Sequence, residues 1–328
     1  MKIWNAEIIT HISIQSARRW LLLAGLVLIN MSTQAFPAPA PQAKNYLAAG
    51  IALYGKGELN FALQAFTKSI ELDPNEPLAY INRGVVRYRL GDLEGALADQ
   101  TKAIGLNPRQ AEAFLNRGDV RRAKKDLDGA IADYTEAINL QPKSASGYNN
   151  RGLARVSKSD ADGALADFNE ALKLNPLYPQ AYINRAVIHL AKATRALEEA
   201  QSKTDTPDGE ALQNQAGEHL KIVFKDTTTV TVLKPPNADL AEAYSVRGQA
   251  FMRMSMEKEA LEDFAKAIEL NPRLAIPYLY RGGVRVQGRD FAGGLEDLKK
   301  AVELMPELKP LAEPWIKQVE ELQAKKAQ

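Results

Sequence analysis

Hydrophobic and small residues recur along this chain in a pattern with a period of about 34 residues. Aromatic side chains keep the same step, and after an interruption the phase returns at Tyr244/Tyr278, Gly248/Gly282 and Pro272/Pro306. Residues of three further kinds stay in register: Gly50, Gly84, Gly118 and Gly152; Ala62, Ala96, Ala130 and Ala164; Pro74, Pro108, Pro142 and Pro176. A fixed period of this length predicts stacked supersecondary units.

Each repeat contains two helical stretches of about 13 residues around a short turn. In residues 111–144 the first helix is expected to begin near Ala111, and the second follows Asp126, whose carboxylate can cap it. Asp92, Asp160 and Asp290 are equivalent, and Met256 breaks the pattern. The closing proline ends the second helix. One hairpin cannot bury its own apolar face, so the pattern predicts an all-α, right-handed solenoid.

Three short sequence motifs in the second repeat, residues 77–110, resemble a known family. They are Ala-Tyr-Ile-Asn-Arg-Gly at 79–84, Gly-Ala-Leu-Ala-Asp at 95–99 and Lys-Ala-Ile-Gly-Leu-Asn-Pro at 102–108. They resemble the tetratricopeptide repeat, and the likeness extends over nearly all of residues 43–308 as about seven repeats, one of them interrupted. The resemblance implies α-helical hairpins with a concave groove that binds peptides or partner proteins. It names no partner.

The N-terminal residues read as a targeting segment. Arg18-Arg19 precede the apolar run Trp20–Ile29, and the small residues Thr33 and Ala35 follow it. This order is typical of a secretory signal peptide, so residues 1–35 are expected to be removed and the protein to reach a periplasm or an equivalent lumen. An uncleaved membrane anchor is the alternative. Residues 36–42 form a Pro/Ala-rich spacer.

The rest of the chain divides into four segments. Residues 43–200 hold four repeats and the first helix of a fifth, residues 241–308 hold the last two repeats, and residues 309–328 are expected to form a capping helix. Between them, 201–240 is expected to hold a displaced second helix and an irregular excursion, because Asp226–Val232 is a poor helix former. That insertion is either a tolerated loop or hinge, or a partner-specific contact.

An arginine at the seventh position of a repeat recurs together with an aspartate at the twenty-third. The first repeat has Ala49 and Ala65 instead, so both charges are lost together. Joint loss indicates contact between the two helices of a hairpin, and structural ion pairs are favoured over ligand binding. The pairs are Arg83/Asp99, Arg117/Asp133, Arg151/Asp167, Arg247/Asp263 and Arg281/Asp297.

The best candidates for binding lie on the first helix of each repeat. Asn82, Asn116, Asn150 and Asn184 share the sixth position, which in the resembling family faces the groove. Such a row of amides can pair with a peptide backbone, or it can hydrate and cap locally. Apolar candidates near the first two repeats are Leu47, Tyr54, Ile81 and Tyr88, with Ile51 and Val85; Arg89, Asp119 and Arg122 add polarity further along.

The amino-acid composition limits the kinds of catalytic, metal and nucleic-acid-binding site that the chain can form. The chain has 328 residues, no cysteine and three histidines, which excludes thiolate sites and leaves little for metal or triad catalysis. The net charge of +2 lies within residues 1–35, and the remainder holds 39 basic and 39 acidic side chains, so nucleic acid is not an expected partner. No cofactor, metal or catalytic residue is predicted. We expect a non-enzymatic scaffold or assembly factor of the cell envelope that binds protein segments; a self-assembling structural protein is the alternative.

Overall fold

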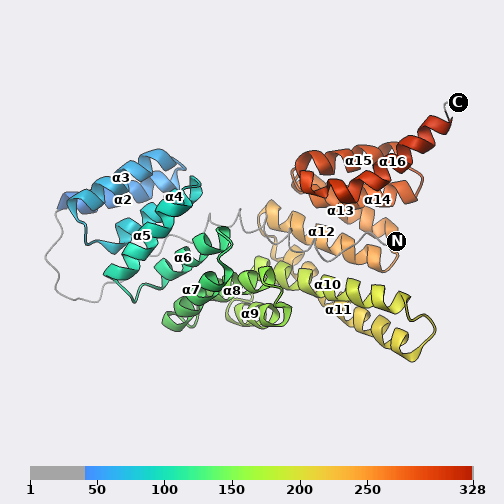
Figure 1. The fold of residues 1–328 in the computed structure, drawn as a ribbon, viewed down its shortest axis with the longest axis horizontal. Coiled ribbons are helices and arrows are strands. Elements are labelled where there is room, and N and C mark those ends of the chain that lie inside the picture. The colour runs from blue at the N-terminus through green and yellow to red at the C-terminus, as the bar shows by residue number, and fades with distance from the viewer. Residues whose placement is uncertain (1–40, 327–328) are drawn as a thin grey trace. The chain divides into compact units, whose positions relative to one another are not determined.

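The computed structural model describes residues 41–326, and every regular element in that span is helical (Figure 1). These residues divide into two compact units, 41–176 and 177–326. The predicted signal peptide and most of the predicted spacer lie outside the described residues. The spacer was expected to reach residue 42, but the first described helix already begins at Pro41.

The unit of residues 41–176 is a row of helical hairpins. Its helices are α2 (Pro41–Gly55), α3 (Leu59–Leu72), α4 (Pro77–Arg89), α5 (Leu93–Leu106), α6 (Ala111–Ala123), α7 (Leu127–Leu140), α8 (Ala145–Ser157) and α9 (Ala161–Leu174). Each helix packs against the next, and the first helices of neighbouring hairpins also touch. The surface formed by α2, α4, α6 and α8 is called the first-helix wall below.

The unit of residues 177–326 continues the same construction with longer members. It contains α10 (Pro179–Gln201), α11 (Pro207–Leu233), α12 (Asn237–Arg253), α13 (Glu257–Leu270), α14 (Ala275–Gln287), α15 (Phe291–Leu304), a 3₁₀ turn η2 (Pro306–Leu308) and α16 (Lys309–Lys326). Here α10, α12 and α14 contact one another in turn. Since α10 and α11 pack on α12, the compact unit begins at Leu177, not after residue 200 as the sequence suggested.

Local chemistry accounts for the hairpins. Asp126 begins α7 and accepts a hydrogen bond from the Gly129 amide at 3.0 Å, and Asp92, Asp160 and Asp290 cap their helices in the same way. Met256 provides no side-chain cap, as expected. In several hairpins a glycine of the first helix lets an aromatic ring of the second helix approach the backbone: a Cβ at Gly152 would lie 2.6 Å from the Phe168 ring. The hairpins therefore pack closely because of their sequence.

The segment 201–240 is more regular than predicted. Its second helix, α11, runs unbroken through Asp226–Val232, so the expected irregular excursion there is wrong. Asp226 pairs with Arg185 at 2.7 Å across a sequence separation of 41, where the other hairpins use a spacing of 16. The fifth hairpin is thus a complete repeat with an insertion at its turn, which lengthens both helices and brings Asp226 into the place of the missing aspartate.

The C-terminal helix covers the last hairpin. Val319 and Ala312 of α16 are fully buried in the core that α14 and α15 share, with Trp315 and Ile316 packed against it. Leu322, near the end of the same helix, is 37% exposed. The capping helix is therefore confirmed. Across residues 41–326 no helix combines the length and the apolarity that a membrane crossing requires.

Candidate functional site

The arginines and aspartates that recur together in the sequence lie in contact. The shortest N···O distances are 2.7–2.8 Å in all five pairs: Arg83–Asp99, Arg117–Asp133, Arg151–Asp167, Arg247–Asp263 and Arg281–Asp297. The carboxylates are only 3–6% exposed. Hydrogen bonding to the aspartate raises the pKa of Arg247 and of Arg281. Each pair joins the two helices of one hairpin, which is a structural position.

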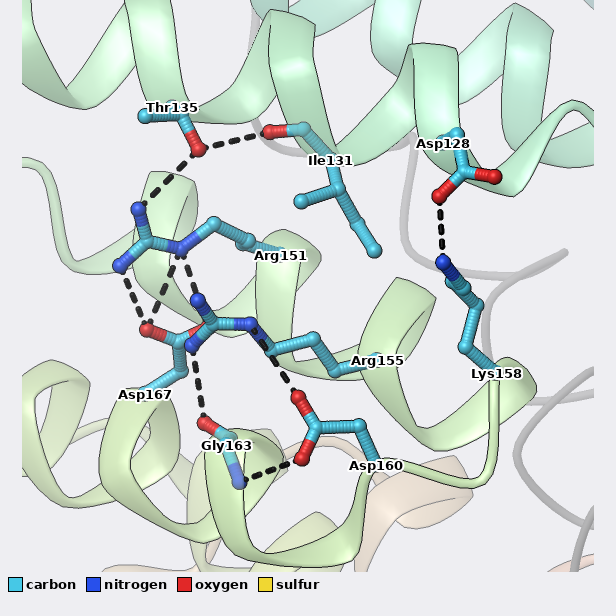
Figure 2. Close-up of polar contacts among 9 residues, drawn as sticks. All are labelled: Asp128, Ile131, Thr135, Arg151, Arg155, Lys158, Asp160, Gly163 and Asp167. Carbon is cyan, nitrogen blue, oxygen red and sulfur yellow. Dashed lines mark hydrogen bonds and ion pairs between the residues drawn. The ribbon is translucent and has the colours of Figure 1, made fainter.

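A second arginine, absent from the sequence interpretation, completes this arrangement. Figure 2 shows Arg155 beside Arg151: its Nη1 lies 2.8 Å from Asp167, and its Nε lies 3.7 Å from the capping Asp160. Arg87, Arg121 and Arg285 repeat this contact at 2.8–2.9 Å. Their signal was present in the sequence, because Arg87, Arg121 and Arg155 keep the period of the repeat.

The same network ties one hairpin to the one before it. Arg151 donates to Thr135 Oγ1 of α7 at 3.2 Å (Figure 2). In the same way Arg83 donates to Thr67 of α3 at 3.4 Å. Arg151 also lies over the Tyr148 ring, 5.5 Å from its centroid. The Nε, Nη1 and Nη2 atoms of Arg83 and Arg151 all donate to aspartate or threonine side chains. These arginines therefore stabilise the stack of hairpins and have few donors left for a ligand.

A different cluster, centred on α6 of the first-helix wall, departs from the repeat pattern. The position of Asp119 is apolar in the neighbouring repeats, as Ile51, Val85 and Leu153, and that of Arg122 is Tyr54, Tyr88 and Val156. Gln100 and Tyr134 occupy a core position that is Phe66 and Phe168 elsewhere in the unit. We call Gln100, Asn116, Asp119, Arg122 and Tyr134 the polar cluster.

The members of the polar cluster meet in space. Tyr134 Oη donates to Asp119 Oδ1 at 2.7 Å, and Arg122 Nε lies 3.4 Å from the same hydroxyl. Burial raises the pKa of Asp119, which the Arg122 charge and the Tyr134 hydrogen bond oppose. Burial and the Asp119 charge also raise the pKa of Tyr134 well above its usual range, so the phenol remains a donor.

Two buried atoms of the polar cluster have no hydrogen-bond partner. They are Asn116 Nδ2, a donor, and Gln100 Oε1, an acceptor. Gln100, Asn116, Asp119 and Tyr88 line one narrow cavity, about 10 Å³ in volume, between α4, α5 and α6. Unpaired buried polar atoms are costly, so a water molecule or another hydrogen-bonding group that reaches this cavity would be stabilised there.

The predicted asparagines are used unequally. Asn82 Nδ2 donates to Leu78 O of its own helix at 2.7 Å, a local bond. Asn150 Nδ2 reaches Asp119 Oδ1 at 3.3 Å and so extends the polar cluster to α8. Asn184 is 8% exposed and belongs to the other unit. Of the four, Asn116 belongs to the polar cluster and Asn150 contacts it.

The apolar candidates also divide. Ile81 is 1% exposed and belongs to the core, so its assignment to a binding surface is wrong. Leu47 and Tyr54 are partly buried against the core of the first hairpin, and Arg89 lies 5.0 Å above the Tyr54 ring. Tyr88 borders the cavity of the polar cluster. Of these residues, Tyr88 is placed to help form a site there.

Sequence reasoning missed a histidine pair in the fifth hairpin. His189 of α10 and His219 of α11 meet with their Nδ1 atoms 3.0 Å apart. Burial, then the charges of His219, Arg185 and Lys192, lower the pKa of His189 to about 4, and burial lowers that of His219. Surrounding cations disfavour a bound metal cation. Among residues 41–326 no group of three or more acidic, histidine or cysteine side chains is arranged to hold a metal ion.

The histidine pair should make folding sensitive to acid. Because the folded pKa of His189 lies near 4, below its ordinary 6.5, the unfolded chain takes up the proton first. The contribution of His189 to stability is therefore fully present above pH 6.5 and is lost as the pH falls toward 4. Changing both histidines to Gln should flatten this dependence by an amount on the order of 1 kcal/mol, measured by urea unfolding at several pH values.

The wild-type protein is the control for that experiment. Asp239, whose pKa burial raises to about 7, titrates in the opposite sense in both proteins, so only their difference reports on the histidines. Parallel pH profiles for the two proteins would contradict the assignment.

The lengthened hairpin also lines a recess. A pocket of about 490 Å³ lies between the outer part of α10 and the ends of α12 and α14. Leu197, Met252 and Val284 give it apolar walls, and Glu198 and Glu257 lie at its edge. Arg253 donates to Thr194 there at 2.9 Å.

Family models match several parts of the chain. One described as TPR repeat matches residues 50–91 and 118–158, and two described as tetratricopeptide repeat match residues 149–202, and residues 78–110 together with 241–274. The chain contains tetratricopeptide repeats. The polar cluster lies on α5, α6 and α7, within matched residues of the unit 41–176, except that Asn116 falls just outside them.

Solved structures share the fold. The crystal structure of the APC/C hetero-tetramer Cut9–Hcn1 contains a chain that is 14% identical with a TM-score of 0.65, covering 84% of this chain and 48% of that one. This chain thus spans about half the length of that relative. A tetratricopeptide repeat protein from Parabacteroides merdae is 18% identical with a TM-score of 0.61, covering 85% and 99% of the two chains. No curated protein sequence matches this chain.

Proposed function

We propose that this protein is a non-enzymatic scaffold that binds an extended segment of a partner protein along the first-helix wall, with the polar cluster at its centre. One observation carries the proposal: Asn116 Nδ2 and Gln100 Oε1 are buried beside the same cavity without partners. A peptide backbone offers one acceptor and one donor per residue, which is the complement of this pair.

The charges of the site favour a main-chain ligand over a charged one. The oppositely charged side chains of Asp119 and Arg122 lie 3.9 Å apart, so the polar cluster has no net charge that would select an acidic or a basic partner. The helices that hold it are already packed, so few groups must be ordered on binding. Affinity would come from backbone hydrogen bonds together with contacts to Tyr88.

We further propose a site of action in the cell envelope, in the periplasm or an equivalent lumen. Support comes from the N-terminal order of basic, apolar and small residues and from the lack of cysteine. An assembly factor or scaffold there would hold partner segments without chemistry of its own.

The decisive variant gives the polar cluster the residues that neighbouring repeats use. It carries Gln100→Phe, Asp119→Leu, Arg122→Val and Tyr134→Phe. Removing buried polar groups from an otherwise apolar position should raise the free energy of unfolding by about 1–3 kcal/mol, and it should abolish capture of the partner segment. Urea unfolding measures the first effect; pull-down from envelope extract followed by titration of the recovered segment as a synthetic peptide measures the second.

Lys102→Gln, on the exposed side of α5, is the matched control and should change neither quantity. If the fourfold variant recovers the same proteins with the same affinity as the wild type, the polar cluster is not the binding site. If the fourfold variant binds normally but is more stable than the wild type, the polar cluster affects only the stability of the protein and has no role in binding.

A further inference from the structure

The first hairpin presents an apolar face that nothing among the described residues covers. Phe61 is 60% exposed and Tyr46 is 40% exposed. Together with Ala49, Leu53 and Ala65 they line an open hollow of about 580 Å³ on α2 and α3. Exposed aromatic patches of this kind are typical of interaction surfaces.

Within residues 41–176 this face is the one on which each later hairpin meets its predecessor. In the second hairpin Arg83 uses it to reach Thr67 of α3, and its partner Asp99 lies beside it. Ala49 and Ala65 occupy the equivalent positions in the first hairpin, so both charges are absent. A terminal repeat that faces water is expected to carry a polar outer surface or to be covered by a cap. The last hairpin is covered by α16. The first hairpin instead exposes the aromatic side chains of Tyr46 and Phe61 on its outer surface.

The pattern along α3 fits a second copy of itself. Glu58, Phe61, Ala65 and Lys68 all line the hollow and follow one stripe of the helix. In an antiparallel pair related by a two-fold axis near Leu63, Glu58 of one copy lies opposite Lys68 of the other, and Phe61 lies opposite Ala65. Opposite charges and a large side chain facing a small one are the complementarity that an isologous contact requires.

We propose that this protein forms a two-fold symmetric dimer through the α2–α3 face of two copies, with their α3 helices antiparallel. Lys68 now pairs with Glu71 at 2.9 Å, but both side chains are about half exposed, at 49% and 56%. Such a surface pair is weak, so exchanging it for Glu58 of the second copy is readily reversible. The contact lies on the end of the unit, apart from the polar cluster on α5, α6 and α7.

Sedimentation of the full chain over a wide range of concentrations tests the dimer. Wild type should pass from monomer to dimer as concentration rises, and Phe61→Asp should weaken the dimer about tenfold or more, because it places a charge in the apolar centre. Val232→Asp is the matched control: Val232 is 73% exposed on α11, and its variant should dimerise like the wild type.

A charge exchange identifies the partner as the same surface. Glu58→Lys alone and Lys68→Glu alone should each weaken the dimer, because like charges then face each other, while the double variant should restore it. Circular dichroism melting checks that every variant stays folded. Wild type that remains monomeric at all concentrations overturns the proposal, as does a Phe61→Asp protein that dimerises normally. A monomer that dimerises only after deletion of residues 1–40 also overturns it, and assigns the face to the chain's own N-terminal segment.

Discussion

Replacing Asp167 by alanine is expected to lower the free energy of unfolding by about 3–5 kcal/mol. The carboxylate is 3% exposed and accepts from Arg151 and Arg155 at 2.7 and 2.8 Å (Figure 2). Its removal leaves two partly buried guanidinium groups facing each other without the charge that separates them. Urea unfolding, followed by circular dichroism, gives the difference directly.

Asp160 supplies the matched control for that substitution. It contacts the same Arg155, but it is about half exposed, and its main role is to cap α9. Asp160→Ala should therefore cost only about 1 kcal/mol. Removing Arg151, Arg155 and Asp167 together should cost less than Asp167→Ala alone, since no uncompensated charge remains. Equal losses for Asp167→Ala and Asp160→Ala would contradict the structural role of the network.

Gly152→Val is expected to destabilise the protein by about 1–3 kcal/mol, the cost of overpacking a core. The glycine lies where α8 meets α9, and a Cβ there would stand 2.6 Å from Phe168 Cε1. Because Phe168 is fully buried, the ring cannot move aside without displacing its neighbours. Chemical unfolding again provides the measurement.

Gly105 distinguishes this steric effect from helix propensity. It lies within α5, and no atom comes within 4 Å of a Cβ built on it. Gly105→Ala should therefore stabilise the protein by about 0.5–1 kcal/mol, the ordinary gain on replacing glycine inside a helix. The fifth hairpin shows the natural compensation: Ala186 replaces the glycine, and the smaller Thr227 occupies the place of the ring. A stabilising Gly152→Val would contradict the packing account.

Features that act within one hairpin could be read from the sequence. The capping aspartates, the closing prolines and the Arg–Asp pairs each involve groups on one helix or on the two helices of a single repeat, so the periodic register alone places them. The second arginines belong to the same class, because they keep the period of the repeat and contact the same aspartates.

The insertion shows where local propensity fails. Asp226–Val232 is rich in β-branched residues and was expected to leave the helix, yet α11 continues through it. Val223, Thr227 and Val230 are fully buried, and Asp226 bonds Arg185 on α10. Burial against a long neighbouring helix outweighs the few tenths of a kcal/mol per residue by which these side chains disfavour helix.

From its order of residues alone, this chain specified stacked helical hairpins, their length and the contacts inside each one, because those follow from spacings shorter than a single repeat. The meeting of Gln100, Asn116, Asp119 and Tyr134, and of His189 with His219, could be seen only once the helices were packed. The groups of each cluster come from more than one helix, so what brings them together is how neighbouring helices and hairpins pack, and that packing also decides which polar atoms are buried without a partner.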